Sequence, residues 1–401
     1  MSKIITSEYC INVTDGTHDT PKPCEEGNFL ITSKHILNGV LVTDGAYKIS
    51  MTDYEKVIKR SKVEQWDILF SMIGSVGEVY IERNPNPEYA IKNLGLFKMG
   101  GDKYKALKLY YYLKSYKFQR KLSFWLSGSI QSFVPLDFLR NIELDDIEAI
   151  TDDEIDEIEL IQESIKTNLS IINKSNEYLQ LLFHKWFIEF KFPDTKNNIS
   201  KNNYGKFPND WRYEELPKLC SVVDCLHSAK PNRIDTENDN ILLQLFNIKD
   251  FGLLDLTEKY YITDEDYKLW TSRIEVTTGD ILITNAGRVG AMAQVPSNCK
   301  CAIGRNITAI RPIDIPPTYL YLYLNSSDCA KQIRKNTDQG SFFGSLNVRG
   351  IKQLKILVPS EEVLTKFEEQ ARGLREKIEV LNIENHKLIE IRDLLIKKII
   401  K

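Results

Sequence analysis

The chain lacks the features that would place it at once in a membrane, secreted or metal-binding class. No stretch of its 401 residues approaches the roughly 20 apolar residues of a membrane span, and Met1–Ser7 contains no apolar signal core. The seven cysteines are scattered, and the closest pair, Cys299 and Cys301, is too tightly spaced for a zinc-type Cys-x-x-Cys pair. These absences predict a cytoplasmic chain with reduced thiols and no metal site.

An excess of positive charge is also missing. The formal net charge is −3, from 53 basic and 56 acidic residues. Any binding to nucleic acid must therefore come from local basic faces, because the net charge does not attract a polyanion.

Motifs of catalysis are absent as well. The chain has no Gly-x-x-x-x-Gly-Lys-Ser/Thr loop to hold a nucleotide. The segment Asn84–Tyr89 is only superficially similar to the Asn/Asp-Pro-Pro-Tyr motif of amino-methyltransferases, and we expect it to form a turn. His18 and His227 stand near Asp15 and Asp224 without the further partners that metal binding or base catalysis needs, so we expect loop hydrogen bonds there.

The chain does contain an internal repeat, in which one set of short motifs occurs twice. The first copy has Asp67-Ile68-Leu69 followed by Gly74-Ser75-Val76-Gly77, and the second has Asp280-Ile281-Leu282 followed by Gly287-Arg288-Val289-Gly290 at the same spacing. Ala90-Ile91 and Gly128-Ser129 recur as Ala302-Ile303 and Gly340-Ser341. A period of about 200 residues is too long for a solenoid, whose repeats run at about 20–50 residues. The pattern predicts a duplicated globular domain.

Each copy mixes short β-rich runs with turns, and the fold class predicted is α+β. Helices are expected around Thr52–Lys62 and Tyr104–Leu122, and the Gly-x-x-Gly segments are expected to form tight turns between strands. The predicted boundaries are a first domain at 1–150, a long helix at 151–192, a polar linker at 193–205, a second domain at 206–358 and a second long helix at 359–401.

The two long segments carry heptad patterns of the kind found in paired helices. Thr151-Asp152-Asp153-Glu154 is a capping box at the start of the first, while Asn168 and Ser175 weaken its apolar stripe in the middle. Asn385 lies in the stripe of the second, where such a residue fixes register at a cost in stability. The residues expected to pair the helices are Ile158, Ile165, Ile172, Leu179, Leu182, Leu374, Ile378, Leu381, Asn385, Leu388 and Leu395.

Pairing of these helices with each other is favoured over packing of each on its own domain, because equal stripes follow two copies of one domain. The linker is too short to run back along a helix of about 60 Å, so the pair is expected to be antiparallel, with the domains at opposite ends of a rod. Such a rod reaches across one to two turns of duplex DNA and would hold two different readers at fixed separation.

At this point the residues resemble a known family, the specificity subunits of type I restriction–modification systems. The resemblance covers essentially the whole chain and is carried by Asp15–Pro23, Leu181–Phe190, Gly279–Gly290 and Ala302–Asn306. It departs from the family pattern where Trp66 stands in place of the glycine found at Gly279, and the first copy lacks a clear counterpart of Phe207–Trp211.

The resemblance implies two α/β target-recognition domains, separated by two long antiparallel coiled-coil helices, in a subunit that catalyses nothing. It implies that each domain reads one half of a split DNA target in double-stranded DNA. The implied partners are two DNA methyltransferase subunits and, in the full complex, ATP-driven restriction and translocation subunits, with no membrane. No cofactor is expected on this chain, whereas S-adenosylmethionine, ATP and Mg are expected on the partner subunits.

DNA reading requires Lys and Arg at phosphates and Asn, Gln, Arg or Ser at base edges. Residues of these types near the repeated motifs are the candidate DNA contacts, and the first copy has fewer arginines among them, which favours less G-directed contacts in its half-site. The candidates are Lys22, Lys34, Ser71, Ser75, Lys92, Asn93, Ser129 and Gln131 in the first copy, and Lys230, Asn232, Arg233, Asn285, Arg288, Arg305, Asn306, Ser341 and Arg349 in the second.

Two other functions stay open on the sequence. A coiled-coil scaffold without a DNA role is favoured slightly by the near-neutral charge. A nuclease or methyltransferase in its own right is disfavoured by the missing motifs.

Overall fold

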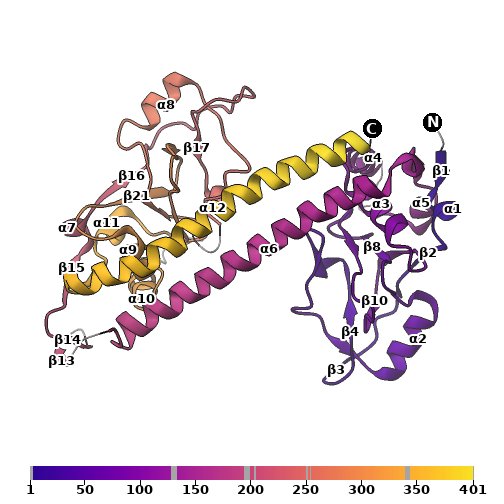
Figure 1. Ribbon diagram of the computed structural model, residues 1–401, viewed down its shortest axis with the longest axis horizontal. Coiled ribbons are helices and arrows are strands. Elements are labelled where there is room, and N and C mark those ends of the chain that lie inside the picture. Colours follow the sequence, from indigo (N-terminus) through magenta and orange to yellow (C-terminus); the bar gives the residue numbers. More distant parts are fainter. Residues whose placement is uncertain are drawn as a thin grey trace. The chain divides into compact units, whose positions relative to one another are not determined.

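The computed structural model describes residues 3–127, 133–193, 199–202, 205–249, 252, 254–338 and 344–400. The chain divides into two compact units: Met1–Ile165 with Leu388–Lys401, and Lys166–Lys387. Each long helix therefore contributes residues to both units (Figure 1).

The first unit is built on an antiparallel sheet with the strand order β2-β11-β8-β9. The central strand β8 is buried at every residue, as expected of a strand covered on both faces. Beside this sheet, β4 pairs with β10 in parallel, and β1 pairs with β12 antiparallel. Its elements are β1 (Lys3–Ile5), α1 (Thr6–Tyr9), β2 (Asn12–Asp15), β3 (Pro23–Cys24), β4 (Asn28–Ile31), η1 (Ser33–His35), β5 (Ile36–Leu37), β6 (Val40–Leu41), β7 (Lys48–Ile49), α2 (Met51–Ser61), β8 (Ile68–Ser71), β9 (Val79–Ile81), β10 (Tyr89–Ile91), β11 (Leu94–Lys98), α3 (Lys103–Lys114), α4 (Tyr116–Ser127), α5 (Leu136–Arg140), β12 (Glu143–Asp145) and η2 (Ile147–Ala149).

The second unit repeats this topology. Its main sheet has the order β16-β21-β18-β19, β17 pairs with β20 in parallel, and β15 pairs with β22 antiparallel. The duplication inferred from short sequence echoes is thus a duplication of strand order. Its elements are β13 (Ile199–Asn202), β14 (Gly205–Pro208), β15 (Arg212–Glu215), α7 (Leu216–Leu219), β16 (Cys220–Asp224), β17 (Leu242–Leu243), η4 (Leu245–Asn247), α8 (Asp264–Trp270), β18 (Ile281–Thr284), β19 (Met292–Gln294), β20 (Ala302–Ile303), β21 (Ile307–Pro312), α9 (Pro317–Leu324), α10 (Ser327–Asn336), α11 (Val348–Lys352) and β22 (Lys355–Val358).

The Gly-x-x-Gly segments are turns between antiparallel strands, as predicted. Gly74 and Gly77 lie between β8 and β9, Gly287 and Gly290 lie between β18 and β19, and all four have positive φ. Trp66, where the second copy has Gly279, also adopts positive φ (71° against 87°). The backbone conformation is therefore kept although the residue best suited to it is lost.

One helix prediction was wrong. The segment expected to form a single helix at 104–122 is two helices, α3 and α4, separated at Ser115. Ser115 is extended (φ −64°, ψ 149°), and its hydroxyl donates to the carbonyl of Tyr112 at 2.6 Å and accepts the N–H of Phe118 at 3.3 Å. The serine thus ends one helix and caps the next, which an apolar periodicity does not reveal.

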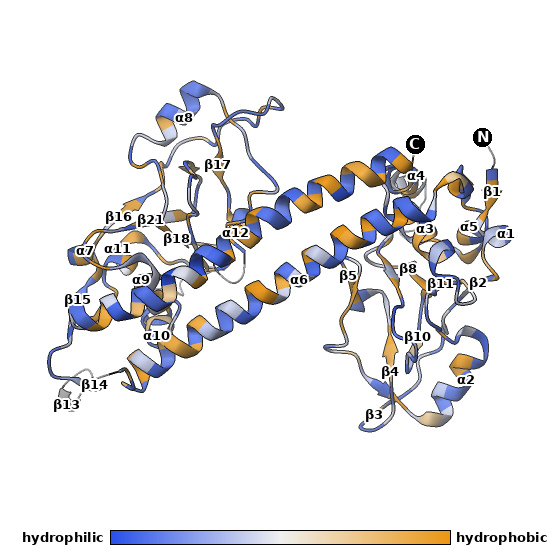
Figure 2. Cartoon of the chain, viewed as in Figure 1, coloured by the Kyte–Doolittle hydropathy of each residue, from blue (hydrophilic) through white to orange (hydrophobic). Residues whose placement is uncertain are grey.

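The long helices are α6 (Asp152–Phe183), continued by a π-helical turn η3 (His184–Ile188), and α12 (Glu361–Ile399). The capping box at the start of α6 is present: Glu154 accepts the N–H of Thr151 at 3.0 Å, and Thr151 Oγ1 accepts the N–H of Glu154 at 3.3 Å. Figure 2 colours both helices in alternating hydrophobic and hydrophilic bands, the pattern of helices with one apolar face.

Within each unit the two helices pair antiparallel. In the second unit, Asn168 meets Asn385 and Phe183 packs against Phe367. In the first unit, Arg392 Nη1 donates to Gln162 Oε1 at 3.0 Å, while Ile158, earlier in α6, shares a core with Ile400, later in α12. Position along α6 thus rises as position along α12 falls. The predicted fold class, mixed helix and sheet with two long helices, is confirmed.

The residues proposed to pair the helices fall into two groups. Some are buried: Ile158, Ile165, Ile172, Leu179, Leu182, Ile378 and Asn385. Others are half-buried: Leu374 and Leu381 against the core of the second unit, Leu395 against the core of the first, and Leu388.

A buried polar pair interrupts the apolar contacts between the helices in the second unit. Asn168 Nδ2 donates to Asn385 Oδ1 at 3.0 Å, and both side chains are buried. Asn168, which on the sequence only weakened its stripe, is the partner of Asn385. Each amide satisfies part of the other's hydrogen-bonding capacity, which an apolar partner would leave unmet.

We therefore expect Asn385→Leu to lower the free energy of unfolding by about 1–3 kcal/mol, because it leaves Asn168 buried and unpaired. The double variant Asn168→Leu/Asn385→Leu is expected to recover most of that loss, and urea denaturation of the four proteins of the cycle measures the coupling. Additive effects of the two substitutions would contradict this account of the pair.

Candidate nucleic-acid interface

In each unit a polar loop lies against the turn that precedes the second strand in the order of the main sheet, which is β11 in the first unit and β21 in the second. In the second unit the loop follows β16, and Arg305, before β21, donates from Nε to the carbonyl of Ser228 at 2.9 Å. In the first unit the loop follows β2, and Lys92, before β11, donates to the hydroxyl of Thr20. The same loop and the same turn therefore meet in both copies, with a cation from the turn holding the loop.

The loop of each copy carries an aspartate–histidine pair. His18 Nε2 lies 3.0 Å from Asp15 Oδ2, and His227 Nε2 lies 2.7 Å from Asp224 Oδ2. His18 also contacts Asn93 Oδ1 through Nδ1, at 3.0 Å. These contacts confirm the prediction that both histidines make loop hydrogen bonds.

The atoms of Asp224, Cys225 and His227 lie within 4.8 Å of one another, a spacing that could hold a cation. Burial, however, raises the pKa of the Cys225 thiol, and the carboxylate of Asp224 raises it further. Asp224 and His227 are in any case already hydrogen-bonded to each other, at 2.7 Å.

Polar side chains of the turn between β18 and β19 form hydrogen bonds to other residues of the second unit. Asn285 Nδ2 donates to the carbonyl of Leu346 at 2.9 Å, and Asn285 Oδ1 accepts the hydroxyl of Thr308 at 3.0 Å. Arg288 donates to the carbonyl of Ile248 while its side chain remains exposed. Of these two candidates, Arg288 is therefore the one that a phosphate can reach.

The prediction that Ser71 contacts DNA is wrong. It is fully buried at the end of β8, and its hydroxyl donates to the carbonyl of Ile73 at 3.3 Å. It is not accessible to a base edge or a phosphate. The sequence could not reveal this, because a serine that ends a buried strand has the same local pattern as one in an exposed turn.

The other candidates differ in exposure. Ser129, Gln131 and Ser341 lie outside the described residues. Lys92, Asn93 and Asn285 are half-buried. Ten are exposed: Lys22, Lys34, Ser75, Lys230, Asn232, Arg233, Arg288, Arg305, Asn306 and Arg349.

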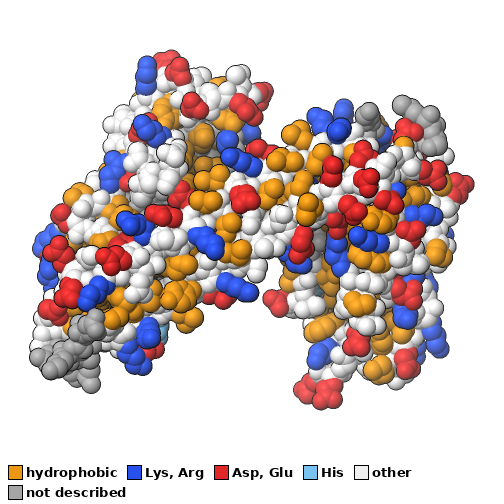
Figure 3. All heavy atoms as spheres, in the orientation of Figure 1, with side chains coloured by type: hydrophobic (Ala, Val, Ile, Leu, Met, Phe, Trp, Pro, Cys, Tyr) orange, Lys and Arg blue, Asp and Glu red, His pale blue; other side chains and the backbone are white. Residues whose placement is uncertain are grey.

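Some exposed cations already have partners. Lys230 lies over the ring of Tyr260, 4.1 Å from its centroid, and Arg233 lies 3.5 Å from a carboxylate oxygen of Glu258. On the face drawn in Figure 3, basic and acidic side chains are interspersed over each unit, in agreement with the net charge of −3. Any attraction for a polyanion would therefore have to come from small groups of cations on the loops.

Sequence reasoning missed two basic residues of the first unit. Lys56 and Arg60 of α2 line a cavity of about 280 Å³ together with Thr17, His18 and Asp19 of the loop. Arg60 also pairs with the buried carboxylate of Asp15. Their spacing of four residues on one helix was the available signal, but nothing in the sequence placed that helix face beside the loop.

Each sheet also contains a buried acid–base pair at the same position. Asp67 accepts from Lys98 at 2.6 Å, and Asp280 accepts from Arg311 at 2.8 and 2.6 Å. Burial raises the pKa of Asp67 despite the nearby Lys98 ammonium. Both aspartates also accept backbone N–H groups, those of Glu64 and Met99 for Asp67 and that of Thr277 for Asp280, so they hold the loops that enter the sheet.

Comparison with known proteins finds chains that are similar to this one in sequence. The chain is 23% identical over 197 residues to the type I restriction enzyme HindI specificity subunit of Haemophilus influenzae. That match covers 48% of this chain and 41% of the other protein. The chain is 29% identical over 209 residues to the putative type I restriction enzyme MjaX specificity subunit of Methanocaldococcus jannaschii, covering 47% and 46%. Parts of the chain are thus similar to type I restriction enzyme specificity subunits.

This relationship agrees with the resemblance predicted from the sequence. The matches span less than half the length of each of these specificity subunits. No protein-family model matches the chain. Among the described residues, no helix is both long enough and apolar enough to cross a membrane.

The fold is shared with a solved specificity subunit. The crystal structure of a type I restriction–modification system S subunit from M. genitalium aligns over 100% of this chain and 96% of its own, with a TM-score of 0.58 and 14% identity. At 14% identity, this similarity shows a shared fold only.

Proposed function

We propose that the chain is the DNA-specificity subunit of a type I restriction–modification complex and has no catalytic activity of its own. The observation that carries the proposal is the twofold occurrence of one sheet topology, each copy with the same cation-held loop. The sequence similarity to type I restriction enzyme specificity subunits supports it.

In this proposal residues 1–150 and 206–358 are target-recognition domains, each reading one half-site of a bipartite target in double-stranded DNA. The helices at 151–192 and 359–401 set the separation of the half-sites and bind two methyltransferase subunits, and 193–205 is the linker. Antiparallel helix pairing within each unit supports this assignment. The methyl donor, ATP and Mg would be bound by the partner subunits.

The decisive experiment is co-expression of the chain with cognate type I methyltransferase subunits, together with methylome sequencing of the host with and without the gene. We expect a stable complex and a methylated split motif that disappears with the gene. No complex, or an unchanged methylome despite an active methyltransferase, would overturn the proposal.

A coiled-coil scaffold without a DNA role is the second candidate, because the chain carries no net positive charge. It predicts that the complex is not retained on duplex DNA even at low salt. The specificity-subunit proposal predicts retention that falls steeply as salt rises.

Substitution of exposed cations tests the interface directly. Lys34→Ala and Arg349→Ala remove one exposed cation from each proposed recognition domain. Since such residues neutralise phosphates, we expect each to weaken binding by the complex on all DNA sequences and to reduce the salt slope by about 1. Lys105→Ala, an exposed lysine of α3 outside the candidate loops and the long helices, is the matched control and should leave affinity and slope unchanged.

A further inference from the structure

Two thiols of the second unit lie in contact with each other. Cys299 Sγ and Cys301 Sγ are 3.5 Å apart, and the two residues are the closest cysteine pair in the sequence. Cys301 is fully buried, whereas Cys299 is 9% exposed and stands between two exposed residues, Asn298 and Lys300. The pair therefore lies at the base of an exposed turn, with Cys299 the nearer of the two to solvent.

The repeated fold does not require this pair. By the sequence repeat, the matching positions in the first unit are Pro87 and Tyr89, neither of which carries a thiol. The parallel strand pairs β4–β10 and β17–β20 nevertheless form in both units. The same topology is thus built with and without cysteines at these positions.

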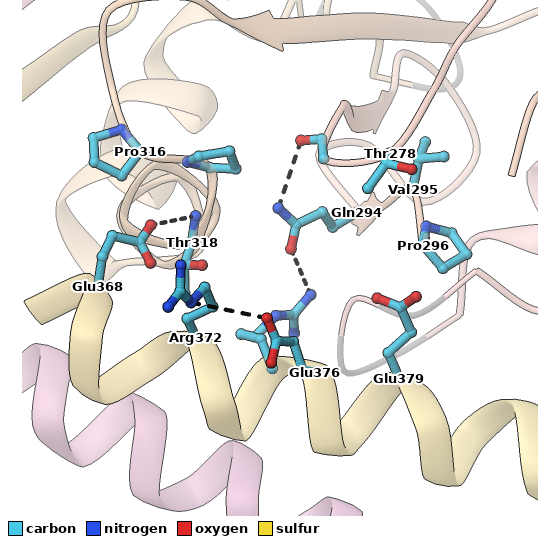
Figure 4. A pocket seen from close by; sticks show the side chains of 13 residues that line it. Thr278, Gln294, Val295, Pro296, Pro316, Thr318, Glu368, Arg372, Glu376 and Glu379 are labelled. Atoms are coloured by element: carbon cyan, nitrogen blue, oxygen red, sulfur yellow. Dashed lines mark hydrogen bonds and ion pairs between the residues drawn. The ribbon is translucent and has the colours of Figure 1, made fainter. Parts of the chain in front are cut away.

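The folded chain holds the two cysteines close together. Cys301 is paired with Val276 by two backbone hydrogen bonds, of 3.0 and 3.2 Å. The turn before it is tied to α12, because Glu379 Oε1 accepts the N–H of Ser297 at 2.6 Å. Figure 4 shows the Glu379 carboxylate directed from α12 towards the loop that follows β19. Cys299 lies between these two attachments and belongs to no strand, so it is kept beside Cys301.

Contact between the thiols makes Cys299 the more reactive sulfur. A hydrogen bond from the Cys301 thiol lowers the pKa of Cys299, although burial and the carboxylate of Glu379 act in the opposite direction. The hydrogen bond to Cys299 and burial raise the pKa of Cys301. Since the thiolate is the nucleophile in cysteine chemistry, oxidation should begin at Cys299. A second thiol beside the first is also the usual arrangement of cysteines that are oxidised reversibly.

The surroundings of the pair favour covalent chemistry over metal binding. Zinc sites use more than two protein ligands. Among the described residues, the set of three His, Cys, Asp or Glu ligand atoms within 4.8 Å of one another includes neither Cys299 nor Cys301. A disulfide, in contrast, needs only that the 3.5 Å contact shorten by about 1.5 Å, to a bond of about 2.05 Å.

We propose that Cys299 and Cys301 are a site of reversible oxidation, at which hydrogen peroxide converts the two thiols to a disulfide. The chemistry of these thiols is independent of the proposed function. Cys299 Sγ attacks one peroxide oxygen, the O–O bond breaks, and the other oxygen takes up a proton and leaves as water. Cys299 is then a sulfenic acid.

The second step joins the sulfurs. Oxidation of Cys299 removes the negative charge that held the proton on Cys301, so the second thiol is freed to react. Cys301 Sγ attacks Cys299 Sγ, the S–O bond breaks, and the hydroxyl leaves as water with the Cys301 proton. The two sulfurs together lose two electrons, which the peroxide gains.

The experiment treats the full native chain with hydrogen peroxide, blocks the remaining thiols with N-ethylmaleimide in denaturant and digests the chain with trypsin. Trypsin cleaves after Lys300, so a disulfide leaves the peptides 289–300 and 301–305 joined, as mass spectrometry detects. We expect this joined pair as the main disulfide product, and dithiothreitol should separate it. Cys299→Ser and Cys301→Ser should each abolish it.

Two other cysteines serve as internal controls. Cys24 is exposed, so labelling of its sulfenic acid with dimedone shows that the oxidant is active. Cys329 is buried, and burial raises the pKa of its thiol to about 12. Because a smaller fraction of Cys329 is thiolate, its oxidation should be at least about tenfold slower than the joining of Cys299 to Cys301.

A parallel reaction in urea separates the contact in the folded chain from mere closeness in sequence. Joined peptides from the native chain support the proposal. Labelling of Cys24 without joined peptides from the native chain overturns it, and so does a disulfide that forms only in urea.

Discussion

Replacing Asp67 with alanine is expected to lower the free energy of unfolding by about 3–5 kcal/mol, the range for breaking a buried ion pair. The carboxylate is fully buried, lies 2.6 Å from the ammonium of Lys98, and accepts the backbone N–H groups of Glu64 and Met99 at 2.8 and 3.0 Å. Its removal leaves both N–H groups without their acceptor and takes from Lys98 its buried counter-ion, so that the ammonium keeps only the exposed carboxylate of Glu64, 2.6 Å away. Urea denaturation followed by circular dichroism measures the loss.

The second copy supplies an internal comparison. Asp280 occupies the matching position, but its partner Arg311 is 39% exposed at the side chain, whereas Lys98 is 18% exposed. Water can therefore replace part of what Arg311 loses, and Asp280→Ala should cost less, about 1–3 kcal/mol. Asp19→Ala, at an exposed loop position, should change stability by no more than about 0.5 kcal/mol. Equal effects of all three substitutions would contradict the structural role assigned to the buried pair.

Replacing Phe367 with alanine is expected to cost about 3–5 kcal/mol and to loosen α12 from the second unit. The side chain is fully buried, and its ring centroid lies 4.8 Å from that of Phe187, 5.7 Å from Trp186 and 6.4 Å from Tyr319. The cavity left by the ring is bounded by residues of α6, η3, α9 and α12, so several elements lose contacts together.

Because α12 also carries the surface proposed to bind a methyltransferase, Phe367→Ala should reduce both the thermal stability of the chain and its yield of complex. Denaturation midpoints and co-purification measure the two effects. Phe124→Ala removes an equally large ring that is 83% exposed and should change stability little. A stable Phe367→Ala variant would mean that α12 contributes little to the core of the second unit.

The local features that the sequence predicted correctly are those set by periodicity and by backbone conformation. Seven-residue spacing of apolar residues predicted α6 and α12, since an apolar stripe on a helix has to be covered. The repeated Gly-x-x-Gly segments predicted turns, because positive φ favours glycine. Thr151 and Glu154 predicted the start of α6 because both halves of a capping box lie within four residues.

The errors arose where a distant contact decides the environment of a residue. Ser71 looked like an exposed turn residue and is buried in the sheet. The break at Ser115 depends on a hydroxyl that bonds to its own backbone neighbours instead of continuing one helix. Lys56 and Arg60 were overlooked because only the packing of α2 brings them to the loop that carries His18.

The sequence by itself determined that this protein has two similar bodies and two heptad-patterned helices, because repetition and periodicity are properties of the linear order of residues. Tertiary structure alone decided which of its polar residues are exposed, that Asn168 meets Asn385, and that Ser71 is buried. The physical reason is that hydrogen bonding and desolvation depend on the neighbours of a side chain in space, and those neighbours can be far away in sequence, 217 residues in the case of Asn168 and Asn385.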